Sequence, residues 1–248
     1  MKLSKTLFFL ILISSLNYSV AQKLTDRDGN VYGTAKFNNT TWMTSNLSVK
    51  HFRNGDAIPQ VQSAEKWVEA TNNHKPAWCY YQDESGLDKS IVLYNWFAVS
   101  DPRGLAPAGT HIPSYIEWSS LIKDNGGITI FAKKIKSKTS WETPQDLVLD
   151  DLNKFNAKPV GSRYVELDAS FNWTDMFTEY GPSKGKYTNF WTTTSLMNDK
   201  NSDYAHRIGL AFNYTDVIID KNGTSYSETI LNHKGNGFSV RCIIDAMP

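Results

Sequence analysis

A histidine and a glutamate six residues apart form the first pair in this sequence that could perform chemistry. The stretch "GTHIPSYIEW", residues 109–118, contains His111 and Glu117, and an imidazole beside a carboxylate can hold a metal ion or transfer a proton. The same stretch also marks a helix start, because Ser114 followed three residues later by Glu117 is a capping box. We therefore expect His111 to be a hydrogen-bonded structural residue that precedes a helix.

Other catalytic patterns are missing from the sequence. The remaining histidines are scattered, and no H-E-x-x-H, G-x-S-x-G or P-loop motif occurs. Calcium would need about six to eight converging oxygens. The acidic loop residues that could supply some of them are Asp150, Asp151, Asp168 and Asp175. We interpret these acids as solvated loop residues and turn caps, so the sequence supports no cofactor and no catalytic constellation.

The aromatic residues between about 140 and 190 are better candidates for a binding role. They are too many for a solvated loop and too irregularly spaced for one face of an element: Trp141, Tyr164, Phe171, Trp173, Phe177, Tyr180 and Tyr187. We expect most of them to pack with Trp191 into a small core that orders the loop. The residues that could instead be exposed, as flat contact surfaces for a sugar ring or a protein, are Trp173 and Tyr180, with Trp141 and Tyr187 as further candidates.

Two cysteines, Cys79 and Cys242, allow two interpretations. In an oxidising compartment they could form a disulfide that closes nearly the whole domain, worth up to about 5 kcal/mol in the chain-entropy model. Alternatively, they could be two buried free thiols. Two cysteines are too few for structural zinc, which usually takes four ligands. From the residues alone, we favour the disulfide.

The first 21 residues have the features of a secretory signal peptide. Lys2 and Lys5 precede the apolar run "LFFLILISSL", and "SVA" at 19–21 is a small-residue cleavage site. We therefore predict that the mature protein is exported to the periplasm, the cell surface or the medium. No later window approaches the roughly 20 apolar residues of a membrane helix, so we predict no membrane span.

The charge balance argues against a nucleic-acid partner. Removing residues 1–21 takes away two lysines and no acids, which leaves 24 basic against 25 acidic residues. Nucleic-acid binding relies on clustered positive charge. The one basic run, "KKIKSK" at 133–138, is interpreted as the solvated face of an element whose apolar side carries Phe131 and Ile135.

The local patterns predict an α+β chain with a single domain over residues 22–248. Helices are predicted over 63–73, capped by Ser63 and with Trp67 in the core, and over 114–124. Strands or buried segments are predicted in a hairpin over 30–49 that turns at Asn38–Asn39, over 76–83 and 90–99, and again from residue 190 to the end. Between about 139 and 190 the regular pattern fades into a long irregular region, which in a compact domain is usually functional or disordered.

Seven segments carry a resemblance that extends over nearly the whole mature chain. They are "DRDGNVYGTAKFNNTTWMTSNL" (26–47), "WCYYQDE" (78–84), "LYNWFAV" (93–99), "GLAPAGTHIPSYIEWSSL" (104–121), "KPVGSRYVELDASF" (158–171), "FWTTT" (190–194) and "GFSVRC" (237–242). In this order they resemble the Fibrobacter succinogenes major paralogous domain family, which occurs in exported bacterial proteins.

The resemblance implies a C-type-lectin-like fold, related to that of formylglycine-generating enzymes. Such a fold has a twisted antiparallel sheet, one or two packed helices, adjacent N- and C-terminal strands and a long loop region on one side. It would put Cys79 on an early strand and Cys242 on the last, plausibly adjacent. The chain departs from both sets of relatives. It lacks the E-P-N, Q-P-D and W-N-D tripeptides of sugar-binding lectins, and it has only Cys242 where the enzymes have a reactive cysteine pair.

We therefore expect an exported, non-catalytic binding module that recognises a glycan or a surface protein through the long aromatic-rich loop region. One alternative is an oxidase-like enzyme on a formylglycine-generating scaffold, in which Cys242 would be reactive. The other is a structural subunit of the bacterial cell envelope.

Overall fold

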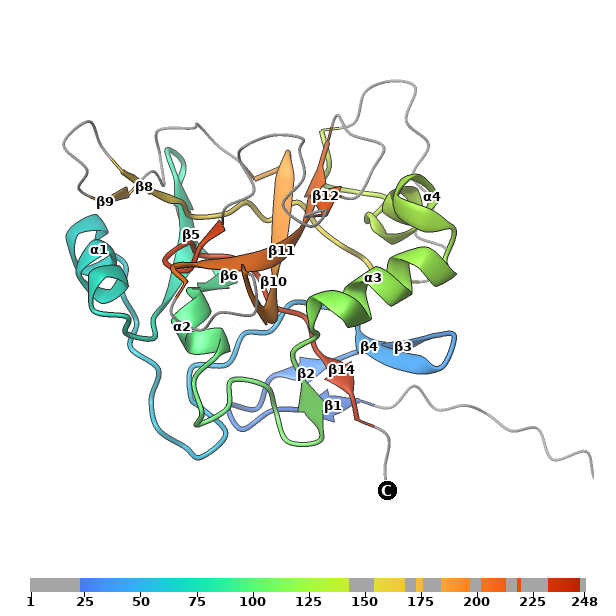
Figure 1. Ribbon diagram of the computed structural model, residues 1–248, viewed down its shortest axis with the longest axis horizontal. Coiled ribbons are helices and arrows are strands. Elements are labelled where there is room, and N and C mark those ends of the chain that lie inside the picture. Colours follow the sequence, from blue (N-terminus) through green and yellow to red (C-terminus); the bar gives the residue numbers. More distant parts are fainter. Residues whose placement is uncertain are drawn as a thin grey trace, which may run out of the picture.

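The computed structural model has a mixed α+β architecture of several small antiparallel sheets and a few helices (Figure 1). It describes residues 23–142, 154–167, 173–175, 184–196, 202–212, 218–219 and 232–245. The predicted signal peptide lies outside these residues. Within them, no helix combines the length and the apolar character needed to cross a membrane.

One four-stranded sheet joins the beginning of the chain to its end. Its strands, in spatial order, are β3 (Thr34–Phe37), β4 (Thr40–Met43), β14 (Ile243–Ile244) and β7 (Thr110–His111). β3 and β4 form the predicted hairpin, and Asn38 in its turn has a φ of 51°, a conformation that asparagine tolerates better than most residues. β14 pairs with β4 on one side and β7 on the other, so an early strand and the last strand lie side by side.

A second four-stranded sheet lies at the centre of the molecule. It contains β10 (Tyr187–Ser195), β11 (Tyr204–Ala211), β12 (Ile218–Ile219) and β13 (Asn232–His233). Successive side chains of a strand point to opposite faces, so neighbouring residues of β10 pack into two different cores. Phe190 is fully buried in a cluster with Trp42 and Trp118, whereas Trp191 is fully buried in the other cluster, against Phe238.

Three two-stranded ribbons complete the sheets. They are β1 (Leu24–Thr25) with β2 (Val31–Tyr32), β5 (Trp78–Asp83) with β6 (Gly86–Tyr94), and β8 (Val165–Leu167) with β9 (Trp173–Asp175). The β5–β6 hairpin turns at Glu84–Ser85, so its second strand begins at Gly86, earlier than the segment predicted from residue 90. Its register shifts between Tyr80 and Tyr81, because Val92 faces Tyr80 while Asp88 faces Tyr81.

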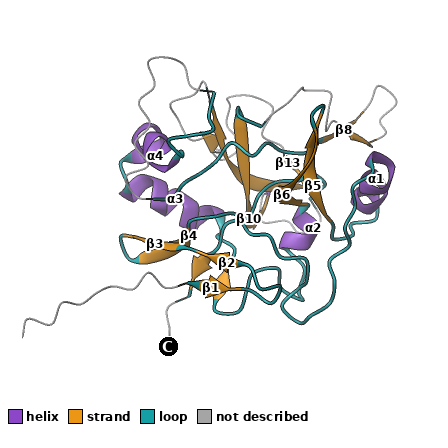
Figure 2. Ribbon diagram, turned by 180° about the vertical axis from the view of Figure 1, so that it is seen from behind, coloured by secondary structure: helices purple, strands orange, loops and turns teal. Residues whose placement is uncertain are grey.

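Four helices flank the central sheet. They are α1 (Ala64–Asn72), α2 (Trp96–Val99), α3 (Tyr115–Asp124) and α4 (Gly127–Ile135). In the two opposite views, α1 lies on one side of the sheet and α3 and α4 on the other (Figures 1 and 2). The predictions for α1 and α3 are confirmed. The Ser63 side chain accepts a hydrogen bond from the amide of Lys66, and Trp67 is fully buried.

The basic run "KKIKSK" follows its prediction only in part. Phe131 and Ile135 are fully buried on the apolar side of α4, and Lys138 is exposed, as expected. Lys136, however, is buried, with its Nζ 2.6 Å from the carbonyl oxygen of Ala211 and 4.9 Å from the centre of the Trp141 ring. Burial lowers the pKa of this ammonium group to about 8. The run is therefore not a uniformly solvated face.

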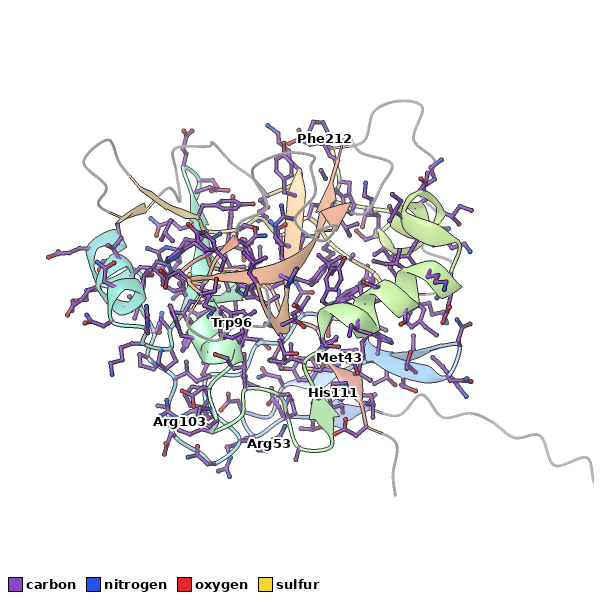
Figure 3. All side chains as sticks on the ribbon, viewed as in Figure 1. Met43, Arg53, Trp96, Arg103, His111 and Phe212 are labelled. Atoms are coloured by element: carbon purple, nitrogen blue, oxygen red, sulfur yellow. The ribbon has the colours of Figure 1, made fainter. Side chains whose placement is uncertain are left out.

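His111 joins the last strand to the start of α3 (Figure 3). Its Nδ1 lies 2.5 Å from Oδ1 of Asp245, and its Nε2 lies 2.7 Å from Oε1 of Glu117. Glu117 also accepts hydrogen bonds of 2.7 Å from the amide and the hydroxyl of Ser114, which completes the capping box. The expectation of a hydrogen-bonded histidine next to a helix cap is confirmed, and the two features share one carboxylate.

These contacts shift the pKa values of His111 and Glu117. Burial opposes protonation of His111, but hydrogen bonds to Asp245 and Glu117 outweigh it and raise the pKa of the imidazole above its ordinary value of 6.5. Burial likewise opposes ionisation of Glu117, but hydrogen bonds from Ser114 and His111 lower the pKa of its carboxyl below 4.5. The protonated histidine between two carboxylates is therefore the favoured state of the folded protein near pH 5 to 6.

The prediction of a disulfide is wrong. Cys79 and Cys242 are both buried free thiols. Cys79 lies on β5 opposite Leu93, in the small core beneath α1. Cys242 lies beside β4, where its carbonyl accepts a hydrogen bond from the amide of Met43, 3.0 Å away. Pairing of the last strand with β4 rather than with β5 thus keeps the two sulfurs in different cores.

The first testable prediction concerns these thiols. Protein purified without reductant and then denatured should titrate with two free thiols per chain, and added reductant should leave its thermal unfolding midpoint unchanged. The same titration after full reduction is the control. A thiol count that rises on reduction, together with a lower unfolding midpoint, would show that the disulfide forms after all.

A second prediction follows from His111. Its stabilising contribution is complete below its unfolded pKa of about 6.5 and disappears as the pH rises through the higher pKa of the folded protein. That of Glu117 is complete above about pH 4.5 and disappears as the pH falls through its lower folded pKa. The difference in thermal stability between wild type and a His111→Gln variant should therefore be largest between about pH 4.5 and 6.5. It should become smaller at higher pH.

Thermal unfolding followed across this pH range measures the effect. The matched control is Asp124→Asn, which removes an exposed charge from the opposite end of α3. A stability difference for His111→Gln that stays constant from acidic to alkaline pH would contradict the ionic role of the histidine.

Candidate functional site

A groove with a volume of about 840 Å³ opens on the described part of the chain. We call it the polar groove. Its lining comes from segments that are far apart in the sequence: residues 30–32, 44–48, 83–92, 156–160 and 184–185, with Ser140 and Arg241. Most of these residues carry a hydroxyl, an amide or a charge. Two of these segments, and Ser140, belong to the long region between 139 and 190.

A buried arginine organises the base of the polar groove. Arg241 is 1% exposed. Its Nε donates to Oδ1 of Asn46 (2.7 Å), its Nη1 to the carbonyls of Met43 (3.0 Å) and Phe155 (2.8 Å), and its Nη2 to the carbonyl of Asn156 (3.2 Å). The guanidinium also lies 4.6 Å from the centre of the Phe155 ring. One side chain thus fixes both the 43–46 segment and the 155–156 segment in the groove.

The β5–β6 hairpin forms a second wall. Its register shift places residues 89–91 in a bulge, and bulges commonly redirect side chains next to functional sites. Asp88, just before the bulge, accepts hydrogen bonds from Ser90 and from Nζ of Lys184, 2.6 Å away. Burial opposes ionisation of Asp88, but these bonds lower the pKa of its carboxyl to about 2. The carboxylate is therefore charged and already engaged.

The facing wall holds two residues in an unusual backbone conformation. Ser140 has a φ of 80° and Asn156 a φ of 56°. Non-glycine residues seldom adopt positive φ, and such residues are concentrated at functional sites. Between them and Lys184, the backbone is held by hydrogen bonds from the amide of Ala157 to Ile135 O and from the amide of Gly185 to Pro159 O, both 2.8 Å. The backbone of this wall is therefore held at two points by hydrogen bonds.

Three polar side chains on the polar groove are exposed and available to a ligand. They belong to Ser45, Ser140 and Lys158. No hydrogen bond or ion pair joins these side chains to any other residue that the structure describes. Val31 adds an apolar contact at the same groove, because it is 58% exposed. Nothing in the sequence singled out these residues, since they share no motif and only the fold brings them together.

The candidate aromatic residues have different positions. Trp141 is 8% exposed and donates from Nε1 to the carbonyl of Ala157 (2.9 Å), so it belongs to the packed group rather than the exposed one. Tyr187 is 36% exposed at the start of β10 and packs edge-on against Phe212. The Trp173 backbone is part of β9, but its side chain is not described, and Tyr180 lies outside the described residues. Trp191 is fully buried with Tyr164 packed against its cluster, whereas Trp141 belongs to the other cluster, so these aromatics do not form the single core around Trp191 that we expected.

The carboxylates that could have contributed to a calcium cage cannot be placed as side chains. Asp150, Asp151 and Asp168 lie outside the described residues, and of Asp175 only the backbone in β9 is described. Within the described part of the chain, no three His, Cys, Asp or Glu side chains form a group that could hold a metal ion.

Cys242 has the environment of a packed, unreactive thiol. It is fully buried, and burial raises the pKa of its sulfhydryl to about 12. A nucleophilic cysteine needs access to substrate and an appreciable thiolate fraction at neutral pH. The surroundings of Cys242 therefore weigh against an oxidase-like role for it.

A third prediction tests the organising role of Arg241. An Arg241→Met variant should lower the free energy of unfolding by about 3 kcal/mol or more, because several buried acceptors lose their donors. An Arg241→Lys variant should restore little of this, since an ammonium cannot reproduce the planar fork. Urea unfolding measures both. The control is Arg103→Lys on the surface, which should lower the free energy of unfolding far less. Equal losses of unfolding free energy at the two positions would refute the prediction.

Comparison with known proteins gives the chain a family. No curated protein and no solved structure matches it. A family model, described as the Fibrobacter succinogenes major domain, matches residues 35–243. This match includes most of the hairpin β3–β4, the capping box, the long region and the start of β14, and it covers the residues that line the polar groove except those at 30–32. The chain belongs to the Fibrobacter succinogenes major domain family.

Proposed function

We propose that this protein is an exported binding module that holds a glycan in the polar groove. The observation that supports this proposal is the separation of the groove's polar groups into two sets. One set, which includes Asn46, Asp88 and Arg241, is fixed by the protein's own hydrogen bonds. The other set, Ser45, Ser140 and Lys158, is exposed and has no partner among the described residues.

This arrangement suits a sugar better than an apolar ligand. A sugar ring presents several hydroxyl groups, which act as both donors and acceptors, and side-chain hydroxyls and amides can meet either role. Groups that are already oriented lose little freedom when the ligand binds, which favours affinity. The volume of about 840 Å³ is in the range of small-ligand sites. The exposed Val31 can contact the apolar C–H face of a sugar ring.

The proposal places the site on the long region between 139 and 190, although not mainly on its aromatic residues. Ser140, Asn156, Lys158 and Lys184 of this region line the polar groove. Trp173 and Tyr180 remain candidate contacts for the same ligand. We also propose that the fold is C-type-lectin-like, supported by the pairing of β14 with β4, the flanking helices and the position of the long region.

The binding proposal is tested by filling the polar groove. Ser45 is exposed, so a Ser45→Trp variant should fold normally while placing a bulky ring among the groove residues. We expect glycan arrays to yield ligands for the wild-type protein, and titration calorimetry to show at least a tenfold weaker affinity for Ser45→Trp, equivalent to about 1.4 kcal/mol. A thermal unfolding midpoint equal to that of the wild type will show that the Ser45→Trp variant is folded.

The matched control is Ser202→Trp, which adds the same ring away from the polar groove, just before β11. It should bind the array ligands as wild type does. If both variants bind equally well, the ligand does not occupy the polar groove. If the wild-type protein retains no glycan, the proposed function is wrong.

A further inference from the structure

We propose that the glycan carries an anionic group, a carboxylate or a sulfate, and that Lys158 is the residue that selects it. This inference rests on the proposed function of the polar groove. It concerns the chemical class of the ligand, and it follows from how the charged residues of the groove are already used.

Lys158 is a cation mounted on a rigid support. The residue before it, Ala157, donates from its amide to Ile135 O (2.8 Å) and accepts at its carbonyl from the amide of Ser137 (2.9 Å). After it, the carbonyl of Pro159 accepts from the amide of Gly185 (2.8 Å). The backbone is therefore held on both sides, while the Lys158 side chain is exposed at the groove.

The two described carboxylates that line the polar groove already have hydrogen-bond partners other than Lys158. Asp88 pairs with Lys184 at 2.6 Å and accepts from Ser90. Asp83 accepts from the amide and the hydroxyl of Ser85. Neither acid has an ion pair with Lys158. An anionic ligand would thus be the partner for Lys158 that the described residues do not supply.

The balance of charges in the groove points the same way. Among the described residues, its lining contains three basic side chains, Lys158, Lys184 and Arg241, against two acidic ones, Asp83 and Asp88. Asp88 neutralises Lys184 directly, and Arg241 donates to Asn46 and to backbone carbonyls rather than to a carboxylate in any of its four hydrogen bonds named above. The groove thus carries a positive excess, which attracts anions and disfavours a cationic ligand.

The proposal also explains a specificity that hydroxyl groups alone do not provide. Neutral sugars differ mainly in the orientation of their hydroxyls, and Ser45 and Ser140 can rotate to suit several of them. A charge-assisted hydrogen bond from an ammonium to a carboxylate or sulfate is stronger than a neutral one and has no counterpart in a neutral sugar. Lys158 would therefore separate acidic from neutral glycans that the rest of the polar groove accepts alike.

The experiment compares three oligosaccharide probes of equal length on the full mature protein. They are oligogalacturonate, its carboxyl-reduced neutral form, and a sulfated galactan oligosaccharide. Titration calorimetry should give an affinity for at least one acidic probe about tenfold above that for the neutral probe, decreasing as salt is added. The comparison of the two acidic probes identifies whether the groove takes a carboxylate or a sulfate.

Substitution of Lys158 then assigns the preference to one residue. Lys158→Gln should weaken binding of the acidic probe far more than binding of the neutral probe and so remove the tenfold preference, and Lys158→Arg should retain most of it. Lys138→Gln, which removes another exposed lysine that does not line the groove, should behave as wild type.

The outcomes separate this inference from the proposal on which it rests. If the neutral and acidic probes bind equally well, or if Lys158→Gln weakens both by the same factor, Lys158 does not select charge, although the groove remains a glycan site. If an acidic preference survives in Lys158→Gln, the anion binds elsewhere and the inference is wrong. If no probe or array glycan binds the wild-type protein, the proposed function fails as well.

Discussion

The buried guanidinium of Arg241 is the interaction on which both the fold and the polar groove depend. Its hydrogen bonds join a segment that follows β4, a segment of the long region and the approach to the last strand. A charge removed from water is strongly destabilising unless every donor finds an acceptor. The native positions of these three segments therefore depend on one another, and the same side chain that holds the base of the groove also holds the approach to the last strand.

Other buried cations follow a common pattern in which an aromatic ring covers the charge. Lys136 lies over Trp141, Arg163 over Trp67 and Lys234 over Trp96, with the nitrogen or guanidinium carbon 4.4 to 4.9 Å from the ring centre. A ring face attracts a cation through its quadrupole and also covers apolar surface. The tryptophans whose side chains the structure describes are thus used in the interior, which explains why an aromatic-rich sequence does not require an aromatic binding surface. Trp141 is the clearest case.

The polar groove gains its character from the rigidity of these surroundings. Asp88 and Asn46 are held by Lys184 and Arg241, so they shape the cavity without being free to rearrange. Ser45, Ser140 and Lys158 are left exposed on that frame. A site of this kind binds its ligand through a few side chains that have no partner within the described protein. Their positions are fixed by many neighbouring side chains that are hydrogen-bonded, and this lowers the entropic cost of holding a flexible glycan.

The sequence by itself determined the features that depend on near neighbours. These features are the Ser114–Glu117 capping box, the Ser63 cap and the turn at Asn38. Each involves residues at most a few positions apart, so it can be recognised from the sequence alone. The segments that resemble the family could be recognised for the same reason, because each is a continuous stretch of sequence. Only the tertiary structure decided the separation of Cys79 from Cys242, the burial of Lys136 and the assembly of the polar groove. Each of these depends on contacts between residues far apart in the sequence, such as Asn46 with Arg241 or Lys136 with Ala211, and no local pattern encodes such contacts.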